Sequence, residues 1–318
     1  MPSAPHADLD IVIVSWNAGD FLRSCVRSLA RAQSSTQARW NIVAVDNAST
    51  DGSADGLSAD LPQLHLLANP ANIGFAAACN QGARAGTAAA ILFINPDIEV
   101  EAGQVDAALA YLGRQGNEGI GVLGVRMHDE NERLQHSTAR RPTPGRLVAQ
   151  SAALDRAWPR LFRPHFMTSL DHAETCAVDQ VMGAFLLIRR ALFEQLGGFD
   201  ERFFIYYEDA DLCLRVRQAG WEVVHFAGAG VRHAGGGSTG KVKAWRLYQL
   251  LRSRIQFIAK HHSYGGTVAV TTSALLMEVP ARILRACLRG STREIADTLA
   301  GARMLLGDLR KLLARSGR

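Results

Sequence analysis

Three acidic side chains are crowded into the segment "FFIYYEDADLCLR", residues 203–215. Glu208, Asp209 and Asp211 follow an aromatic-rich run and precede an apolar helical pattern. Acidic residues stabilise the first turn of a helix by a fraction of a kcal/mol, which accounts for one or two carboxylates but poorly for three. A functional interpretation gives one of them the role of general base, while the others orient it or bind acceptor hydroxyls. A nearby divalent cation would offset their repulsion.

Two further residues have the chemistry of metal ligands. Asp97 ends the segment "FINPD", just after an apolar run. A type I turn with proline at its second position explains this aspartate equally well. Mg²⁺ in proteins commonly takes one or two carboxylates together with phosphate oxygens and water. His233 opens the glycine-rich segment "HAGGGSTG", and imidazole is a known ligand of Mn²⁺, although a lone histidine is more often structural.

Apolar strands alternate with helical patterns over the first half of the chain. Strands are expected over 10–15, 41–45, 64–68, 89–94 and 119–126, and helices over 21–29, 73–86 and 101–115. This alternation predicts an α/β fold with a parallel sheet and helices on both faces. In such sheets a ligand lies beyond the carboxyl ends of the strands. The polar residues that end these strands are Ser15, Trp16, Asn17, Asp46, Asn47, Asn95 and Asp97.

The segments "VDNASTDGS" and "NPANIGFAAACNQG" have the composition of ordinary turns and of a helix start. Their functional interpretation is that Asp46 accepts a hydrogen bond from a pyrimidine ring, while Asn72 and the backbone near Gly74 contact a nucleoside. Small residues would let the following helix lie close to the ligand. The segment "GIGVLG" matches a dinucleotide-binding pattern, but no apolar helix follows it, so we reject that interpretation.

The later chain is predicted to contain an irregular excursion over 128–177, a strand at "VMGAFLLIRR", a short helix stopped by Gly197 and Gly198, the helix from Glu208 and the strand "WEVVHF". After residue 240 the composition changes to basic amphipathic helices, expected over 243–260, 274–288 and 293–315. We therefore divide the chain into a catalytic domain, 1–240, and a basic helical extension, 241–318.

Charge and composition limit the function classes. The extension has 15 Lys+Arg and 4 Asp+Glu, a net charge of +11, whereas the rest carries −6. Such a tail can bind anionic membrane, and nucleic acid is disfavoured because few aromatics are present to stack bases. Five scattered cysteines and no apolar leader favour a reduced, cytoplasmic protein. The apolar run "TVAVTTSALLM" is expected to be too short to span a bilayer, which takes about 20 residues.

Taken in order, the segments "IVIVSWNAGDFLRSCVRSL", "VDNASTDGS", "NPANIGFAAACNQG", "FINPDIEV", "MGAFLLIRRALFEQLGGFDERFFIYYEDADLCLRVRQAGW" and "VRHAGGGS" resemble glycosyltransferase family 2, the inverting enzymes of GT-A fold. The resemblance covers about residues 9–240 and is closest to bacterial rhamnosyltransferases. It implies that Asp46 holds the pyrimidine base, helped by Trp16, Asn17 and Asn72.

The same resemblance implies roles for the acidic residues and the histidine. The "NPD" segment matches the family's DXD metal motif with Asn95 at its first acidic position, so Asp97 must do most of the work. His233 matches a metal-ligand position, and the metal is Mg²⁺ or Mn²⁺. Asp209 matches the catalytic base, with Glu208 and Asp211 in support.

The implied reaction moves a sugar, L-rhamnose from dTDP-rhamnose first, to a lipid-linked or oligosaccharide acceptor in cell-wall, O-antigen or capsule synthesis. Galactofuranose, glucose or N-acetylglucosamine transfer is an alternative, as is an inactive nucleotide-binding scaffold. The basic helices would hold the enzyme at the inner membrane surface, or they would pack on the catalytic domain or on a second subunit, which would make a homodimer.

Overall fold

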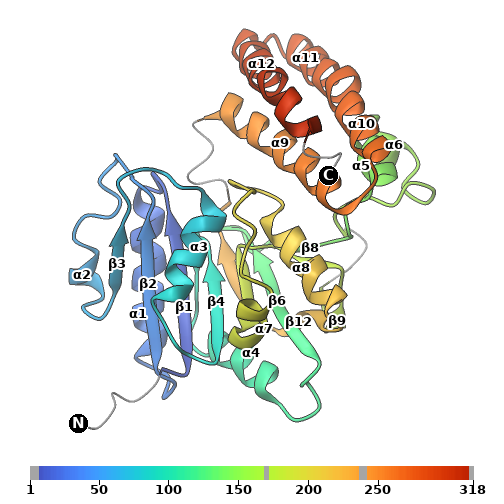
Figure 1. The fold of residues 1–318 in the computed structure, drawn as a ribbon. Helices are drawn as coiled ribbons and strands as arrows, with labels where there is room; N and C mark the ends of the chain where they lie inside the picture. The colour runs from blue at the N-terminus through green and yellow to red at the C-terminus, as the bar shows by residue number, and fades with distance from the viewer. Residues whose placement is uncertain (1–6, 168–171, 236–241, 315–318) are drawn as a thin grey trace. The chain divides into compact units, whose positions relative to one another are not determined.

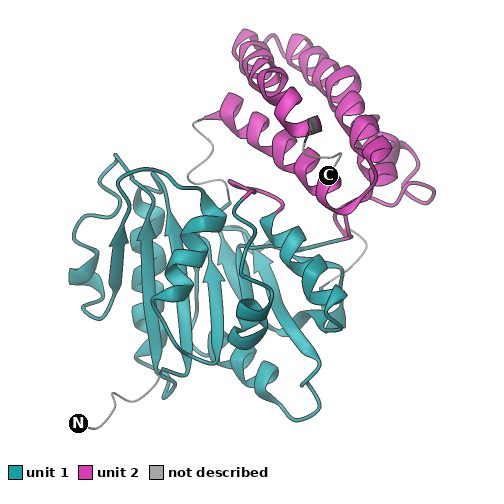
Figure 2. Ribbon diagram, in the orientation of Figure 1, with its two compact units in different colours: residues 1–139, 168–201, 208–238 teal, residues 140–167, 202–207, 239–318 magenta. Residues whose placement is uncertain are grey.

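A computed structural model describes residues 7–167, 172–235 and 242–314 of this protein. The chain divides into two compact units, which Figure 2 distinguishes by colour. The first unit contains residues 1–139, 168–201 and 208–238, and the second contains residues 140–167, 202–207 and 239–318. The second unit thus combines the basic helices with part of the segment that the sequence predicted to be an irregular excursion.

The first unit is built on a ten-stranded mixed sheet (Figure 1). The strand order is β3-β2-β1-β4-β11-β6-β12-β5, with β7 paired to β6 and β9 paired to β12. The strands are β1 (Leu9–Ser15), β2 (Trp40–Asp46), β3 (His65–Ala68), β4 (Ala90–Ile94), β5 (Ile98–Glu99), β6 (Ile120–His128), β7 (Leu134–Gln135), β9 (Cys176–Ala177), β11 (Phe185–Arg189) and β12 (Glu222–His233). A separate pair joins β8 (Thr138–Ala139) to β10 (Gln180–Val181).

Strands β1, β2, β3 and β4 are parallel to one another, and β6 is parallel to β12. Strand β11 is inserted between β4 and β6 and runs antiparallel to both. Consequently β4, β6 and β12 point the same way, so their carboxyl ends and the start of β11 lie at one edge of the sheet. The topology therefore gathers residues from distant parts of the sequence at this edge.

The helices of the first unit are α1 (Asp20–Gln33), α2 (Leu57–Asp60), α3 (Phe75–Arg84), α4 (Gln104–Gly113), α7 (Arg190–Gln195) and α8 (Glu208–Gln218). Residues of β1 alternate between two faces of the sheet. Ile11 and Ile13 join the core that contains Leu22 of α1. On the other face, Gly82 of α3 lies against Val12, where an added Cβ would come within 2.4 Å of a methyl carbon. The small residues of α3 thus allow close packing on the sheet.

The second unit is helical, with α5 (Pro144–Ser151), α6 (Leu154–Ala157), α9 (Lys243–His261), α10 (Tyr264–Ser273), the π-helical segment η1 (Ala274–Glu278), α11 (Val279–Leu288) and α12 (Thr292–Ala314). Helices α9 and α12 pack closely because Gly301 lies beside the carbonyl of Ala244, where a Cβ would meet the oxygen at 2.7 Å. Within this unit the buried guanidinium of Arg254 is 2.5 Å from a carboxylate oxygen of Glu278.

The apolar run that the sequence analysis judged too short for a bilayer belongs to a longer helix. Segments α10, η1 and α11 form one helix of 25 residues, Tyr264–Leu288, and 33% of its most apolar window is buried. By length and composition alone this helix could cross a membrane. The core helix of a soluble protein passes the same test, so the finding by itself is weak evidence of a span.

Candidate nucleotide-sugar site

The loops that follow β1 and β2 are held together by hydrogen bonds. The backbone N–H of Asn17 donates to the Ser49 hydroxyl at 2.9 Å, and the amide oxygen of Asn17 accepts from the N–H of Thr50 at 2.8 Å. Asn17 has a positive φ of 51°, a conformation that asparagine tolerates better than most residues. Because Ser15 pairs with Asp46 in the sheet, the predicted nucleotide-binding residues of both strands lie side by side.

Two residues at these strand ends have oxygen atoms that face little solvent. Ser15 is fully buried, and its hydroxyl has no hydrogen-bond partner within the described part of the chain. Asp46 is 8% exposed, and one of its carboxylate oxygens accepts from the backbone N–H of Ser49 at 3.2 Å. Trp16, which directly follows Ser15 in the chain, is half-buried. Such a rim of polar groups on a rigid sheet suits recognition of a flat polar ring.

Asn47 and Asn72 form a network that organises the loop before α3. The Asn47 amide nitrogen donates to the Asn72 amide oxygen at 2.8 Å, and the Asn47 oxygen accepts from the N–H of Ile73 at 3.1 Å. The N–H of Gly74 also donates to Asn72, at 3.0 Å. Three predicted nucleotide-binding residues are therefore brought together, but their polar groups largely bind one another. We infer that they shape this wall of the site.

Asp97 and His233 lie beside one another although 136 positions separate them in the sequence. Strand β5 pairs with β12 so that Ile98 is opposite His233, and the N–H of Ala234 donates to the carbonyl of Asp97 at 3.1 Å. The His233 Nε2 atom is 3.5 Å from a carboxylate oxygen of Asp97. Asn95 begins the turn, since its carbonyl accepts from the N–H of Ile98 at 3.2 Å. The turn expected at "NPD" is therefore present.

A third residue, Gln135 of β7, orients this histidine. The His233 Nδ1 atom is 2.7 Å from the amide oxygen of Gln135, whose nitrogen donates to the His233 carbonyl at 2.8 Å. An amide oxygen can only accept, so Nδ1 carries a proton and Nε2 faces the Asp97 carboxylate. In the neutral ring Nε2 is an acceptor, and two acceptors that face each other are an arrangement that a cation satisfies. The residues present thus fit a divalent metal.

Protein ligands for such a metal are few. Among the described residues, no group of three or more His, Cys, Asp and Glu side chains is placed to hold an ion. Asp97 and His233 would therefore supply a minority of the ligands. This agrees with the preference of Mg²⁺ for one or two carboxylates completed by substrate phosphate oxygens and water.

The three carboxylates of the opening segment have different environments. Asp211 is fully buried and accepts from Arg215, one turn later in α8, at 2.7 Å. Asp209 accepts from the N–H of Gly183 at 3.0 Å and from that of Ala210 at 2.7 Å. Glu208 is 6% exposed, and one of its carboxyl oxygens has no partner in the described part of the chain. The three carboxylates thus differ in how far hydrogen bonds satisfy them.

The ionisation of these groups differs accordingly. Burial raises the pKa of Glu208 well above its usual value, and the neighbouring charge of Asp209 raises it further. Burial also raises the pKa of Asp209, while hydrogen bonds from Gly183, Ala210 and Gln180 oppose the rise. Both of these carboxyls therefore hold a proton more readily than an exposed one does. Together with the Arg215 ion pair of Asp211, this explains how three acidic residues are accommodated in one helical turn.

Asp209 and the Asp97–His233 pair belong to the same edge of the sheet. Gly183, which contacts Asp209, precedes β11, and the carbonyl of the next residue, Ala184, accepts from the N–H of Asn95 at 3.1 Å. A Cβ on Gly183 would lie 3.5 Å from that of Asp209. Gly183, Gln180 and Gln135 are not among the residues predicted from the sequence. Of these three residues only Gly183 stands out in the sequence, because a glycine in "VMGAF" separates β10 from β11.

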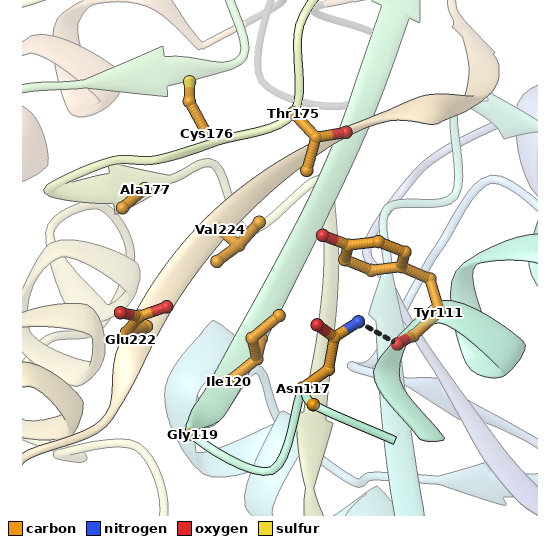
Figure 3. A pocket seen from close by; sticks show the side chains of 10 residues that line it. Tyr111, Asn117, Gly119, Ile120, Thr175, Cys176, Ala177, Glu222 and Val224 are labelled. Atoms are coloured by element: carbon orange, nitrogen blue, oxygen red, sulfur yellow. Dashed lines mark hydrogen bonds between the residues drawn. The ribbon is translucent and has the colours of Figure 1, made fainter. Parts of the chain in front are cut away.

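A cavity of about 290 Å³ lies elsewhere in the first unit and contains none of the predicted site residues. Figure 3 shows it beside the starts of β6 and β12, where Ile120 and Glu222 line it. Tyr111 closes one side and accepts, through its carbonyl, a hydrogen bond of 2.7 Å from the Asn117 amide. These are the amino ends of the two strands, whereas the candidate site lies at their carboxyl ends.

Solved structures with similar folds contain a nucleotide sugar or a nucleotide. One is the mannosyltransferase PcManGT from Pyrobaculum calidifontis, solved with GDP-mannose and Mn²⁺. It has a TM-score of 0.53 at 17% identity, and the match covers 99% of this chain and 87% of PcManGT. The S. aureus TarS 1–349 structure with UDP has a TM-score of 0.51 at 13% identity and covers 96% of this chain and 91% of its own. These likenesses confirm the predicted GT-A fold.

Comparison of sequences identifies the family. A family model described as "Glycosyl transferase family 2" matches residues 10–197. A Mycobacterium tuberculosis protein, N-acetylglucosaminyl-diphospho-decaprenol L-rhamnosyltransferase, is 32% identical over 268 residues, which are 80% of this chain and 85% of that protein. A second model, for the N-terminal domain of galactosyltransferase, matches residues 164–234. The chain belongs to glycosyl transferase family 2 and is a glycosyltransferase, as the resemblance in the sequence predicted.

Proposed function

We propose that this enzyme transfers L-rhamnose from dTDP-rhamnose, with inversion, to a lipid-linked glycan acceptor in cell-wall, O-antigen or capsule synthesis. The observation that carries the proposal is the 32% identity to the mycobacterial rhamnosyltransferase over 80% of the chain. The name of that relative specifies both the sugar and a lipid diphosphate acceptor. The acidic cluster and the Asp97–His233 pair supply the chemistry that such a transfer needs.

On the donor side, the polar edge of the sheet binds the nucleoside diphosphate. Asp46 accepts a hydrogen bond from the pyrimidine, and Ser15, Trp16 and Asn17 form the adjoining wall. Asn47, Asn72 and Gly74 fix the opposite loop, in keeping with their mutual hydrogen bonds. A preformed site of this kind loses little conformational entropy on binding.

Asp97 and His233 would hold a divalent cation, Mg²⁺ or Mn²⁺, with Asn95 at the start of the same turn. Bound there, the cation supplies charge neutralisation for the departing diphosphate. Gln135 keeps the Nε2 atom of His233 directed at the Asp97 carboxylate. Such outer partners normally tune ligand basicity and orientation.

Asp209 acts as the general base. In its ionised form it accepts the proton of an acceptor hydroxyl, and the oxygen forms a bond to the anomeric carbon as the bond to the diphosphate oxygen breaks. Gly183 holds the Asp209 carboxylate in place through its N–H, at 3.0 Å. Glu208 and Asp211 support the base. Because attack comes from the face opposite the leaving group, the configuration inverts.

The test is a panel of nucleotide sugars incubated with the full chain, with release of the nucleoside diphosphate as the readout. We expect dTDP-rhamnose to be processed fastest. Preferential use of a galactofuranose, glucose or N-acetylglucosamine donor would replace the sugar but keep the class of reaction. Nucleotide binding without turnover of any donor or acceptor would favour an inactive scaffold.

The proposed acceptor places the enzyme at the inner face of the cytoplasmic membrane. The exposed arginines and leucines of α11 and α12 support this location, as does the net charge of +11 of residues 241–318. A homodimer through the same helices is the alternative use of this surface. Flotation with vesicles and light scattering in their absence separate the two.

The raised pKa of Asp209 predicts the acidic limb of the pH–rate profile. Asp209 must be deprotonated to accept a proton, so turnover should fall as the pH drops through its pKa. Because burial raises this pKa, the limb should lie above the value of about 3.9 of an exposed aspartate. Glu208→Gln should barely move the limb, since burial and not the charge of Glu208 raises the pKa of Asp209. A limb at or below the ordinary value would contradict this prediction.

Gln135→Leu should weaken Mn²⁺-dependent binding of dTDP about 10- to 100-fold, as loss of an outer partner of a metal ligand commonly does. Without the amide oxygen, the His233 ring loses the contact that fixes its proton on Nδ1. Calorimetric titration of dTDP with and without Mn²⁺ measures the effect. Gln135→Glu keeps an acceptor for Nδ1 and should retain most of the affinity. Equal affinity in the leucine variant would remove this role.

A further inference from the structure

The second unit contains a basic groove between α9, α11 and α12, and none of the proposed donor-binding or catalytic residues lines it. Its volume is about 390 Å³. Five cationic side chains line it, Lys243, Arg246, Arg282, Arg285 and Arg289, against two carboxylates, Glu294 and Asp297. The lining therefore carries a net positive charge of three. Leu247 and Leu250 of α9 form an apolar part of the wall.

Most of these cations are poorly neutralised by the protein. Within the described residues, Lys243, Arg246 and Arg285 have no carboxylate within 4.0 Å. Arg289 is 3.9 Å from Glu294, and its side chain is 64% exposed. Arg282 alone has a close partner, Glu278, at 2.8 Å. Like charges held close together repel one another, so an anion that enters the groove lowers the energy of the folded unit.

The outer side of the groove continues into exposed apolar side chains. Leu284 is 62% exposed and Leu288 is 81% exposed, and each directly precedes a groove arginine, Arg285 and Arg289. Residues four apart lie on one face of a helix. Helix α11 therefore has a leucine stripe beside an arginine stripe. Leu276 of η1, 70% exposed, extends the apolar surface along the same continuous helix.

We propose that this groove binds the phosphate group of an anionic membrane phospholipid, while the leucine stripe enters the apolar layer of the leaflet. Arginine forks pair with phosphate oxygens in a bidentate manner. A soluble phosphate would use the charges but leave the exposed leucines unexplained. A nucleic acid would call for aromatic side chains to stack bases, and the groove lining has none. The inference rests on the proposed function, since it names the lipid partner of an enzyme placed at the membrane.

The test compares two double variants of the full chain in flotation with vesicles. Arg285→Gln/Arg289→Gln removes two groove charges. Arg303→Gln/Arg310→Gln removes two exposed charges of α12 that do not line the groove. Vesicles of phosphatidylcholine with phosphatidylglycerol are the probe, and pure phosphatidylcholine is the reference. We expect the groove variant to bind the anionic vesicles about thirtyfold more weakly, and the control variant to lose less than about threefold.

Equal losses in the two variants would overturn the groove site in favour of a diffuse basic surface. Undiminished binding of the groove variant would overturn it outright. So would saturable binding of inorganic phosphate alone that the groove substitutions abolish without any effect on vesicles. Donor hydrolysis without vesicles should be the same in both variants and in the wild type. If no donor is processed, the proposed function fails, but vesicle binding by the two variants still tests the groove site independently.

Discussion

Asp209→Asn is expected to lower the turnover number by about 10²- to 10⁴-fold, the usual contribution of a positioned general base. Asparagine has nearly the same shape and can still accept the hydrogen bond that Gly183 donates at 3.0 Å. It cannot accept the acceptor's proton, however. The dissociation constant of dTDP should therefore remain near that of the wild type, and single-turnover kinetics with saturating donor isolate the chemical step.

The matched control for this variant is Glu194→Gln in α7. Glu194 is 62% exposed and pairs with Arg190 at 3.3 Å, so the substitution removes one negative charge far less buried than that of Asp209. We expect turnover within about twofold of the wild type, since exposed pairs contribute little. Near-normal turnover of the Asp209 variant would remove this residue from the role of base and leave the fold assignment untouched.

Much of the sheet was predictable because buried parallel strands are short apolar runs with polar ends. The strands predicted at 10–15, 41–45 and 89–94 are within a residue of β1, β2 and β4. The strand expected at "WEVVHF" was too short, because β12 continues to His233 through a bulge between Phe226 and Gly230. Glycine and alanine at 227–230 hide this continuation, since neither residue signals a strand.

The excursion expected over 128–177 illustrates a different limit. Helix α5 begins at Pro144 with the Thr143 hydroxyl accepting from the N–H of Arg146, a cap that the sequence "TPGR" signals only weakly. Its apolar face is short, and it packs against α10, more than a hundred positions away, where Gly266 lies close to Pro144. Local periodicity cannot indicate a helix whose stability comes from such a distant partner.

In the candidate site, the sequence predicted the residue types and the strand ends but not which side chains contact one another. The proximity of Asp97 and His233 follows from β5 pairing with β12, which depends on long-range register. Gln135 carries no signal, because a glutamine in a two-residue strand has no distinctive neighbours. The environment of Glu208 also depends on burial that only the folded chain creates. The sequence thus indicates which groups are available, and the fold decides which of them meet.

Asp97→Asn is expected to weaken Mn²⁺-dependent donor binding by at least about 100-fold, because a direct ligand should matter more than the outer partners whose loss costs 10- to 100-fold. An amide keeps the volume of the carboxylate but loses its charge, and Asn95 already provides an amide in the same turn. Binding of dTDP-rhamnose in the presence and absence of Mn²⁺ measures the change. Glu99→Gln is the control, since Glu99 is two residues away, 42% exposed and 3.6 Å from Arg232.

The pair can be tested as a unit with His233→Ala and the double variant. If Asp97 and His233 hold one cation, the first substitution already removes most of the metal-dependent affinity, and the second should add little. Additive losses would mean that the two side chains act separately, despite the 3.5 Å between His233 Nε2 and Asp97. An unchanged donor dissociation constant in Asp97→Asn would exclude the metal role, and diphosphate departure would then have to rely on other groups at this edge of the sheet.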